Sequence, residues 1–310
     1  MPSLKSIRKR IGSVKSTQKI TRAMKMVAGA RLNRAQQRIT ALRPYAQKTQ
    51  EILEGVTAAL DSGQEEGQQA DSEAIEVEKP VHKLLARRPI KKALFVVLSS
   101  DRGLCGGYNA NVVKLVMREW DARKAEGVEV TFATAGKKAR EAIVRKRGTI
   151  AKDFPKIYDG LDLEKAKLVA DYATEAFLKG DVDAVYVLYT EFKSAMTQRP
   201  SVQQLLPLAK PTKKAEDKEG GAALTKYDYE PNEKALLSRL MPMYVEISIY
   251  RALLDSQASE LGARMTAMDA ATRNAKEMIG RLTLVYNRAR QAAITKELME
   301  IIGGAEALKG

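Results

Sequence analysis

Residues 244–293 read YVEISIYRALLDSQASELGARMTAMDAATRNAKEMIGRLTLVYNRARQAA. Apolar side chains recur along this stretch in alternating steps of three and four, and only Arg251 and Thr272 interrupt the fifteen positions. A 3.5-residue repeat is typical of a left-handed coiled coil, whereas the alternative, an ordinary amphipathic helix with a 3.6-residue repeat, drifts out of this register. At ~1.5 Å per residue the helix is roughly 75 Å long, so it needs a partner helix along its seam. The seam positions are Tyr244, Ile247, Arg251, Leu254, Ala258, Leu261, Met265, Met268, Thr272, Ala275, Ile279, Leu282, Tyr286, Ala289 and Ala293.

The first sixty residues contain a matching pattern, which makes them the obvious partner helix. Its members are Ala28, Leu32, Ala35, Ile39, Leu42, Ala46, Thr49, Leu53, Val56 and Leu60, preceded by Leu4, Ile7, Ile11 and Val14. The first run would continue through Gln18, Thr21 and Lys25, but the apolar Ile20, Met24 and Val27 fall one position earlier. We therefore expect the register to slip there, and we expect Pro44 to kink or loosen the helix.

Charge is distributed unequally between the two arms. The chain has 53 Lys and Arg against 38 Asp and Glu, a formal charge of +15. Residues 1–50 carry thirteen basic side chains and no acidic one, whereas residues 236–310 carry ten basic and eight acidic side chains. A one-signed run repels itself, which favours a specific acidic partner over simple solvation. An acidic protein surface, a nucleic acid or anionic lipid would fit.

Composition excludes several classes of protein. A chain of 310 residues can bury a sizeable core. The single cysteine, Cys105, excludes an internal disulfide and fits a reducing compartment. No run of eighteen apolar residues indicates a membrane span, and the N-terminus lacks the apolar core of a signal peptide. The basic N-terminus partly resembles a mitochondrial transit peptide, but its continuation into a heptad pattern indicates mature protein.

Patterning divides the chain into five segments. We expect a coiled-coil helix over 1–60, an acidic linker over 61–89, an α/β domain over 90–208, a loop over 209–231 and a second coiled-coil helix over 232–310. Acidic residues among Gly, Gln and Ser, with no periodicity, make the stretch 61–80 an exposed loop. Pro242 is expected to interrupt the last helix shortly before its long register begins.

The middle segment alternates strands with helices, which predicts an α/β fold with a parallel sheet and right-handed crossovers. The apolar run Ala93–Leu98 is typical of a buried parallel strand. A Gly-rich turn over 101–109 follows, with Asn109 as a candidate N-cap for the next helix. Further strands are expected at 128–135, 184–192 and 202–208, and helices at 110–125, 137–146 and 163–179.

No catalytic, cofactor or metal site emerges from the sequence. Gly103, Gly106 and Gly107 fit neither spacing of the common phosphate-binding motifs, and a Gly-rich turn has steric reasons of its own. His82 is the chain's sole histidine, so neither a histidine metal site nor a Cys105–histidine nucleophile is expected. The pattern indicates a mechanical or binding protein that needs no cofactor.

Two stretches suggest contacts with other molecules. After Ala293 the register is expected to slip again, with Ile294, Leu298 and Ile301 replacing Lys296 and Glu300 on the seam, beside the glycine pair at 303–304. This predicts a tip that touches something beyond the two-helix rod. The segment KYDYEP at 226–231 is equally compatible with an exposed contact and with local packing.

Four stretches together resemble the ATP synthase gamma subunit of bacterial F-type enzymes. They are STQKITRAMKMVA at 16–28, SSDRGLCGGYN at 99–109, residues 265–274 with LVYNRARQA at 284–292, and ITKELMEIIGGAEA at 294–307. The likeness covers nearly the whole chain in order, apart from the loops at 61–80 and 210–222. Motifs of this length at both ends and in the middle are highly specific.

The resemblance implies a fold and a set of partners. The two terminal helices would form an antiparallel coiled coil inside a ring of three alpha and three beta subunits, as the central-stalk rotor shaft. A central Rossmann-like domain would contact the epsilon subunit and the ring of c subunits, at the cytoplasmic face of the bacterial inner membrane. Rotation would couple proton flow to ATP synthesis, with no nucleotide site, cofactor or nucleic acid on the shaft itself.

The resemblance also implies which residues make these contacts. Met24 and Arg264 would face the alpha and beta subunits, with Arg290, Gln291, Thr295 and Glu297 nearer the tip. The foot that faces the c-ring and epsilon subunit would include Tyr227, Tyr229, Glu230 and Pro231. Having a single cysteine, the chain lacks the regulatory dithiol of chloroplast members of the family.

Two other functions fit parts of the sequence. The basic first arm suits a nucleic-acid-binding protein with a coiled-coil arm, although residues 1–50 offer only Tyr45 for base stacking. The Gly-rich turn suits an enzyme that uses the α/β domain, with the rod as a device for oligomerisation.

Overall fold

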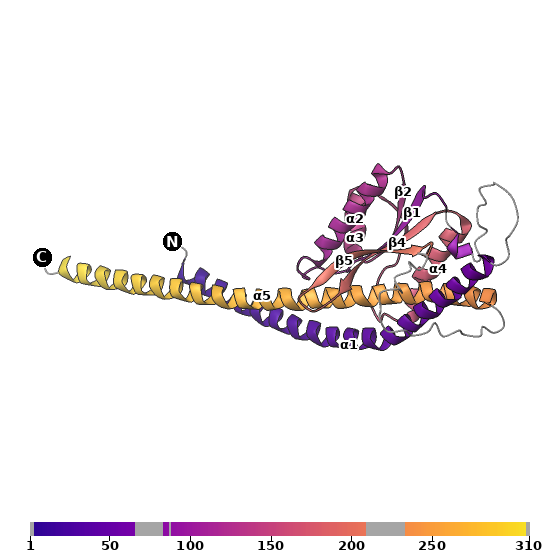
Figure 1. Ribbon diagram of the computed structural model, residues 1–310. Helices are drawn as coiled ribbons and strands as arrows, with labels where there is room; N and C mark the ends of the chain where they lie inside the picture. The colour runs from indigo at the N-terminus through magenta and orange to yellow at the C-terminus, as the bar shows by residue number, and fades with distance from the viewer. Residues whose placement is uncertain (1–2, 66–82, 87, 209–232, 308–310) are drawn as a thin grey trace. The chain divides into compact units, whose positions relative to one another are not determined.

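The computed structural model describes residues 3–65, 83–86, 88–208 and 233–307 (Figure 1). The chain divides into two compact units. Unit 1 comprises Met1–Arg31 and Arg264–Gly310, and unit 2 comprises Leu32–Ala263. Two long helices, α1 (Leu4–Glu65) and α5 (Glu233–Ala307), each contribute to both units.

Unit 2 contains a five-stranded sheet in the order β3-β2-β1-β4-β5. Strands β1 to β4 are parallel, and β5 pairs antiparallel with β4. A short 3₁₀ helix, η1, precedes β1. The bounds are η1 Lys83–Leu85, β1 Lys92–Leu98, α2 Tyr108–Ala125, β2 Glu129–Ala135, α3 Lys137–Arg145, β3 Thr149–Asp153, α4 Leu163–Lys179, β4 Ala184–Phe192 and β5 Gln198–Leu206.

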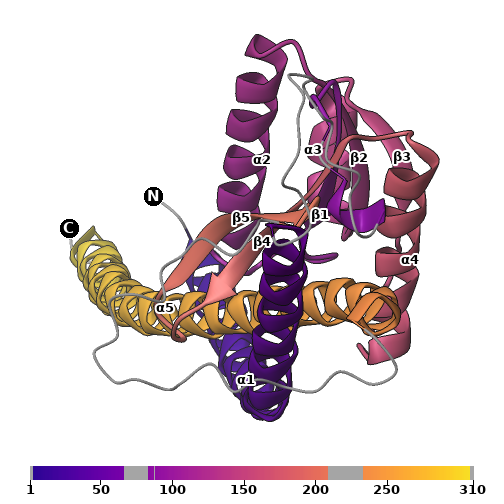
Figure 2. The same cartoon turned by 45° about the vertical axis from the view of Figure 1, so that its right-hand side comes forward.

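The two faces of the sheet are covered by different helices (Figures 1 and 2). Alternate residues of β1 point to opposite faces, because side chains in a strand alternate with period two. Phe95 and its same-face neighbours pack with residues of α2 and α3. Val96 and its same-face neighbours pack with α4 and with the parts of α1 and α5 that belong to unit 2. Burial on both faces explains the unbroken apolar run of β1.

The predicted fold class is confirmed, with three local corrections. The sheet is mixed and not wholly parallel, because β5 returns beside β4 through a short hairpin and not through a crossover helix. Strand β3 has no apolar run and went unpredicted; it is an edge strand with mostly exposed side chains. The expected break at Pro242 is also wrong, since α5 continues through it. Buried Leu237, Met241 and Val245 hold that part of the helix against the core of unit 2.

In unit 1 the N-terminal part of α1 and the C-terminal part of α5 run side by side in opposite directions, as the contact pairs Thr21–Thr272 and Lys25–Asp269 require. Gly29 lies so close to α5 that a Cβ added there would be 3.4 Å from the Met265 sulfur. Along α5 the predicted seam positions from Met265 to Ala293 are all buried or half-buried. The coiled-coil seam read from the sequence is therefore present in this unit.

The predicted slip in α1 is wrong. Thr21 is 8% exposed and so lies on the seam, whereas Ile20 and Val27 are 59% and 53% exposed. Gln18 and Lys25 are half-buried, so the 3.5-residue register continues through polar residues from Ile11 to Ala28. The pattern of apolar residues predicts the wrong face here, because polar residues of α1 lie on the seam and bond to α5.

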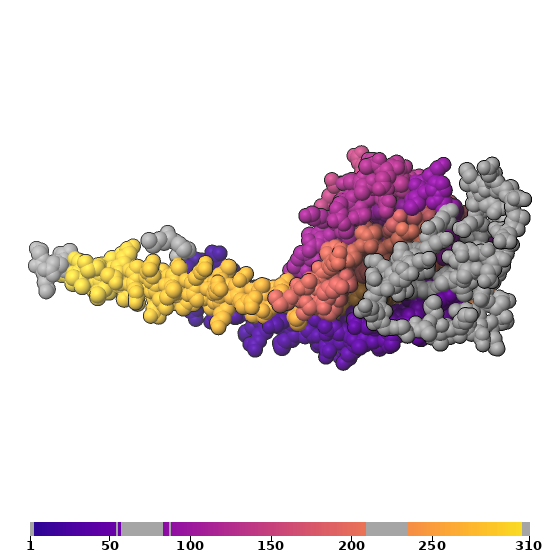
Figure 3. All heavy atoms as spheres, in the orientation of Figure 1, coloured from indigo at the N-terminus to yellow at the C-terminus, as the bar shows by residue number. Residues whose placement is uncertain are grey.

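The last turns of α5 extend past the first turn of α1, as the yellow end of the helix shows (Figures 1 and 3). Every described side chain from Ile294 to Ala305 is exposed. The expected move of the apolar seam to Ile294, Leu298 and Ile301 therefore has no helix to face in this structure, and these three side chains are 56%, 54% and 69% exposed.

Candidate functional site

The ligand-binding position of this kind of sheet is covered by α5. In an open α/β sheet, ligands bind beyond the carboxyl ends of the strands where the strand order reverses, which here is between β1 and β4. Ser256 and Ser259 of α5 bond the backbone near the carboxyl end of β4. Gly262 of α5 lies against the β4–β5 hairpin, since a Cβ added there would be 3.2 Å from Ala195 Cα. The sheet is thus joined to a helix where an enzyme would hold its substrate.

The two serines bond one residue of β4, Thr190, through both of its backbone polar groups. β1 pairs with β4 only as far as Leu188, so Thr190 lies beyond the end of that ladder. Ser259 Oγ donates to Thr190 O at 3.0 Å, and Thr190 N donates to Ser256 Oγ at 3.3 Å. Both serines are fully buried. The hydroxyl groups of α5 therefore satisfy backbone groups of β4 that would otherwise be buried without partners.

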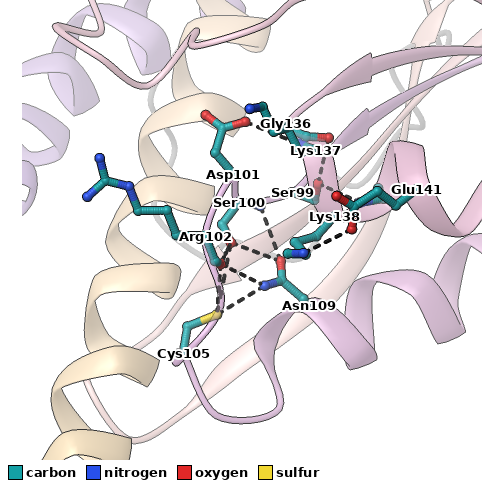
Figure 4. A network of polar contacts seen from close by, with 11 residues as sticks. Ser99, Ser100, Asp101, Arg102, Cys105, Asn109, Gly136, Lys137, Lys138 and Glu141 are labelled. Carbon is teal, nitrogen blue, oxygen red and sulfur yellow. Dashed lines mark hydrogen bonds and ion pairs between the residues drawn. The ribbon is translucent and has the colours of Figure 1, made fainter.

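The Gly-rich turn after β1 is closed by its own side chains (Figure 4). Asn109 Nδ2 donates to Arg102 O at 3.2 Å and to Cys105 Sγ at 3.1 Å, while its Oδ1 accepts from Ser100 N at 3.2 Å. Asn109 therefore folds the turn and is not the N-cap that the sequence suggested; the N-cap of α2 is Gly107, without a side-chain cap bond.

The amino-terminal end of α3 is also satisfied within the protein. The first three amides of α3 donate to acceptors in the turn after β1: Lys137 N to Asp101 Oδ1 at 3.1 Å, Lys138 N to Ser100 O at 3.1 Å and Ala139 N to Ser99 Oγ at 3.0 Å. Phosphate binding at a helix terminus needs such amides to point at the ligand. The geometry thus gives a structural role to the turn that the sequence raised as a nucleotide site.

Three potentially reactive side chains of unit 2, those of Cys105, Tyr108 and Asp255, are buried. Cys105 is 1% exposed and beneath the turn. Burial raises the pKa of the Tyr108 phenol well above its ordinary value, so it stays protonated. Burial also raises the pKa of Asp255 on α5 to about 6, although the positive charge of Arg251 opposes the shift. His82 lies outside the described residues.

Six of the residues expected to contact other subunits lie in the described part of the chain. Met24 on α1 and Arg264 on α5 are half-buried and belong to unit 1. Arg290, Gln291, Thr295 and Glu297 all lie exposed near the end of α5. Tyr227, Tyr229, Glu230 and Pro231 lie outside the described residues.

Two further features are absent from the described part of the chain. None of its helices is long and apolar enough to cross a bilayer. Within the same residues, no three side chains of His, Cys, Asp or Glu are grouped as metal ligands would be.

Comparison with known proteins identifies the family. The family described as ATP synthase matches residues 3–308. The ATP synthase gamma chain of Sorangium cellulosum is 55% identical over 322 residues, and that of Geobacter sp. strain M21 is 48% identical over 310 residues. Each match spans 100% of both chains.

Solved structures agree at the level of the fold. A Euglena gracilis mitochondrial ATP synthase rotor chain has a TM-score of 0.61 at 18% identity, covering 94% of this chain and 98% of that one. A chain from the central stalk and c-ring of the Tetrahymena thermophila mitochondrial enzyme has a TM-score of 0.55 at 23% identity, covering 81% and 99%. The chain therefore belongs to the ATP synthase gamma chain family and is a non-catalytic subunit of that enzyme.

Proposed function

We propose that the paired helices of unit 1 turn inside a ring of three alpha and three beta subunits, and that the turning couples proton flow through a c-ring to ATP synthesis at the beta subunits. The epsilon subunit would bind beside the sheet domain. The chain would lie at the cytoplasmic face of a bacterial inner membrane, held there through the c-ring.

The main support for this proposal is the bare end of α5, residues 294–305, whose side chains are all exposed. Leu298, Met299, Ile301 and Ile302 lie within two turns of one another and are 51–69% exposed. Contiguous apolar surface of this kind is characteristic of a contact site. An apolar sleeve formed by a surrounding ring fits a single helix exposed on every side, whereas a flat partner would cover one side only.

The polar residues near the tip extend the proposed contact. Arg290 and Gln291 lie just before the bare end, and Thr295 and Glu297 lie within it, all with exposed side chains. We assign them, with Met24 and Arg264, to contacts with the alpha and beta subunits. Exposed charge pairs are each worth only ~0.2–1 kcal/mol, which suits contacts that a rotating shaft must break repeatedly.

The foot of the shaft is assigned by family resemblance alone. Tyr227, Tyr229, Glu230 and Pro231 would contact the c-ring and epsilon subunit. Exchange of both tyrosines for alanine should weaken binding to epsilon and the c-ring without changing recovery of the alpha and beta subunits.

The test of the tip uses the full chain, tagged and produced together with its alpha, beta, epsilon and c subunits. Replacing Leu298 and Ile301 by serine should reduce recovery of the alpha and beta subunits at least about tenfold, since each buried aliphatic side chain contributes ~1.5–3 kcal/mol. ATP hydrolysis by the purified complex should fall in parallel.

Leu168 and Leu178 on α4 provide a matched control. They are 63% and 46% exposed, so their replacement by serine changes apolar surface to a similar degree in unit 2. Recovery of the ring should be unaffected. Equal recovery with the tip variant and the control variant would refute the assignment of the tip to the ring.

A further inference from the structure

The α1 helix of unit 1 has two faces that could pack on α5. One face contains Gln18, Thr21 and Lys25, and the other contains Ile20, Met24 and Val27, one position earlier. A shift of one residue corresponds to a rotation of about 100° about the helix axis. Burial of apolar surface alone favours the second face. The structure nevertheless buries Thr21 and leaves Ile20 and Val27 more than half exposed.

Hydrogen bonds join the polar face to α5. The Thr21 and Thr272 hydroxyl oxygens lie 2.8 Å apart and share a hydrogen bond across the seam. Each hydroxyl also lies within bonding distance of a carbonyl oxygen of its own helix, Gln18 O at 3.1 Å and Met268 O at 2.7 Å. Rotating α1 by one residue would separate these hydroxyl groups.

One turn further along, an ion pair also crosses the seam, and a second pair within α5 shares its carboxylate. Lys25 Nζ lies 2.5 Å from Asp269 Oδ1, and Arg273 Nη1 lies 3.0 Å from Asp269 Oδ2. The Lys25 and Asp269 side chains are 44% and 32% exposed, so water screens them only in part. The hydrogen bond from Lys25 lowers the pKa of Asp269, and Arg273 adds to this effect, so the carboxylate is charged near neutral pH.

We propose that Thr21, Lys25, Asp269, Thr272 and Arg273 form a polar lock that selects which face of α1 packs on α5. The lock keeps Ile20 and Val27 out of the seam, at 59% and 53% exposed, and leaves Met24 half-buried. Polar residues at seam positions are known to fix register and orientation at a cost in stability. The inference goes beyond the proposed function, because it concerns the isolated chain.

Disulfide formation between introduced cysteines can report the face. The pair Thr21–Thr272 sets the alignment of the two helices, which places Gln18 level with Ala275. In a full chain whose Cys105 is replaced by serine, Q18C with A275C reports the observed face. T17C with A275C reports the rotated face, because Thr17 would then take the place of Gln18. The measured quantity is the ratio of the two initial rates of cross-linking under mild oxidation.

Breaking the lock should lower that ratio. Asp269→Ala leaves Lys25 without its carboxylate on the seam, and we expect the ratio of observed-face to rotated-face cross-linking to fall about fivefold. Adding Lys25→Met should restore the ratio, since no unpaired charge then remains on the seam; the Arg273 side chain is 71% exposed and stays solvated. Thr272→Val tests the hydroxyl bond alone and should produce a smaller fall.

Glu300→Ala is the matched control. It removes the Lys296–Glu300 pair, whose 3.5 Å contact lies within α5 and does not cross the seam, and it should leave the ratio unchanged. Circular dichroism establishes that each variant is helical, and Asp269→Asn, with a smaller expected fall, replaces Asp269→Ala should the latter not fold. A ratio that stays at the parent value in the Asp269 variant would overturn the polar lock.

Discussion

Unit 2 buries its apolar residues far more completely than unit 1 does. In unit 2, Phe177, Leu253 and Leu254 are wholly inaccessible to solvent, because helices cover both faces of a sheet. In unit 1, Leu282 is only half-buried although it lies on the seam. Two helices alone can hide one narrow stripe each. A seam residue of the same heptad pattern therefore contributes more to the free energy of unfolding in unit 2 than in unit 1.

The largest difference in stability between the two units is expected when one glycine in each unit is replaced by alanine. Gly136 between β2 and α3 has φ +110°, and a Cβ there would stand 2.1 Å from Ser99 O. Gly136→Ala should therefore destabilise the protein by more than about 4 kcal/mol or prevent folding. Gly280→Ala in α5 of unit 1 meets open space and should stabilise by ~0.5–1 kcal/mol.

Urea unfolding followed by circular dichroism checks both glycine variants. Opposite signs are expected for the two midpoints relative to the parent chain. A Gly136→Ala protein as stable as the parent would contradict the close approach of β2 and the turn after β1.

A large-to-small change compares the two kinds of packing directly. Leu253→Ala removes a fully buried side chain from the core of unit 2 and should cost ~2–5 kcal/mol. Leu282→Ala removes one that is already partly solvated, so roughly 1–2 kcal/mol is expected. Thermal melting of both variants gives the comparison. Equal losses would show that the seam of unit 1 is packed as tightly as the core.

The buried carboxyl group of Asp255 makes the stability of unit 2 depend on pH. Burial raises the pKa of Asp255 from 3.8 to about 6, against the opposing charges of Arg251, Arg43 and Lys193. The folded state therefore binds this proton more tightly than the unfolded state, and the cost of ionising Asp255 develops as pH rises from about 4 to about 6. Above pH 7 the cost is up to about 3 kcal/mol, at 1.36 kcal/mol per pKa unit.

Asp255→Asn should remove that cost. The variant should be more stable than the parent chain at pH 8, and the difference should shrink towards zero near pH 4. Urea titrations at the two pH values measure it. Glu141→Gln is a suitable comparison, because Glu141 is exposed and its pKa is lowered by Lys138, the opposite direction. A gain for Asp255→Asn that is the same at both pH values would contradict the assignment.

The long-range features of the fold could be predicted from the sequence, because they depend on repeated patterns. The seam from Met265 to Ala293 and the buried strand β1 both follow from the spacing of apolar residues. Strand β3 could not be predicted, since an edge strand with exposed Thr149 and Lys152 has no such pattern. The continuation of α5 through Pro242 depends on packing against distant residues, which local propensity does not record.

The polar features were less accessible to sequence reasoning. Thr21 and Thr272 are far apart in the chain, and their bond is visible only when both helices are placed. Asn109 appeared as a helix cap because asparagine is common there, but its side chain instead folds the preceding turn. The residues near the α5 tip were placed by family resemblance, and their contacts stay a prediction.

The bonding of Thr190 has a mechanical consequence for the molecule. Both backbone polar groups of this residue pair with α5, through Ser256 and Ser259, so two bonds run from the strand directly into the helix. Moving α5 away would leave the buried N–H and C=O groups of Thr190 without hydrogen-bond partners. For the same reason, a displacement of β4 would also displace α5. The edge of the sheet where other α/β proteins bind small molecules is here bonded to the long helix α5.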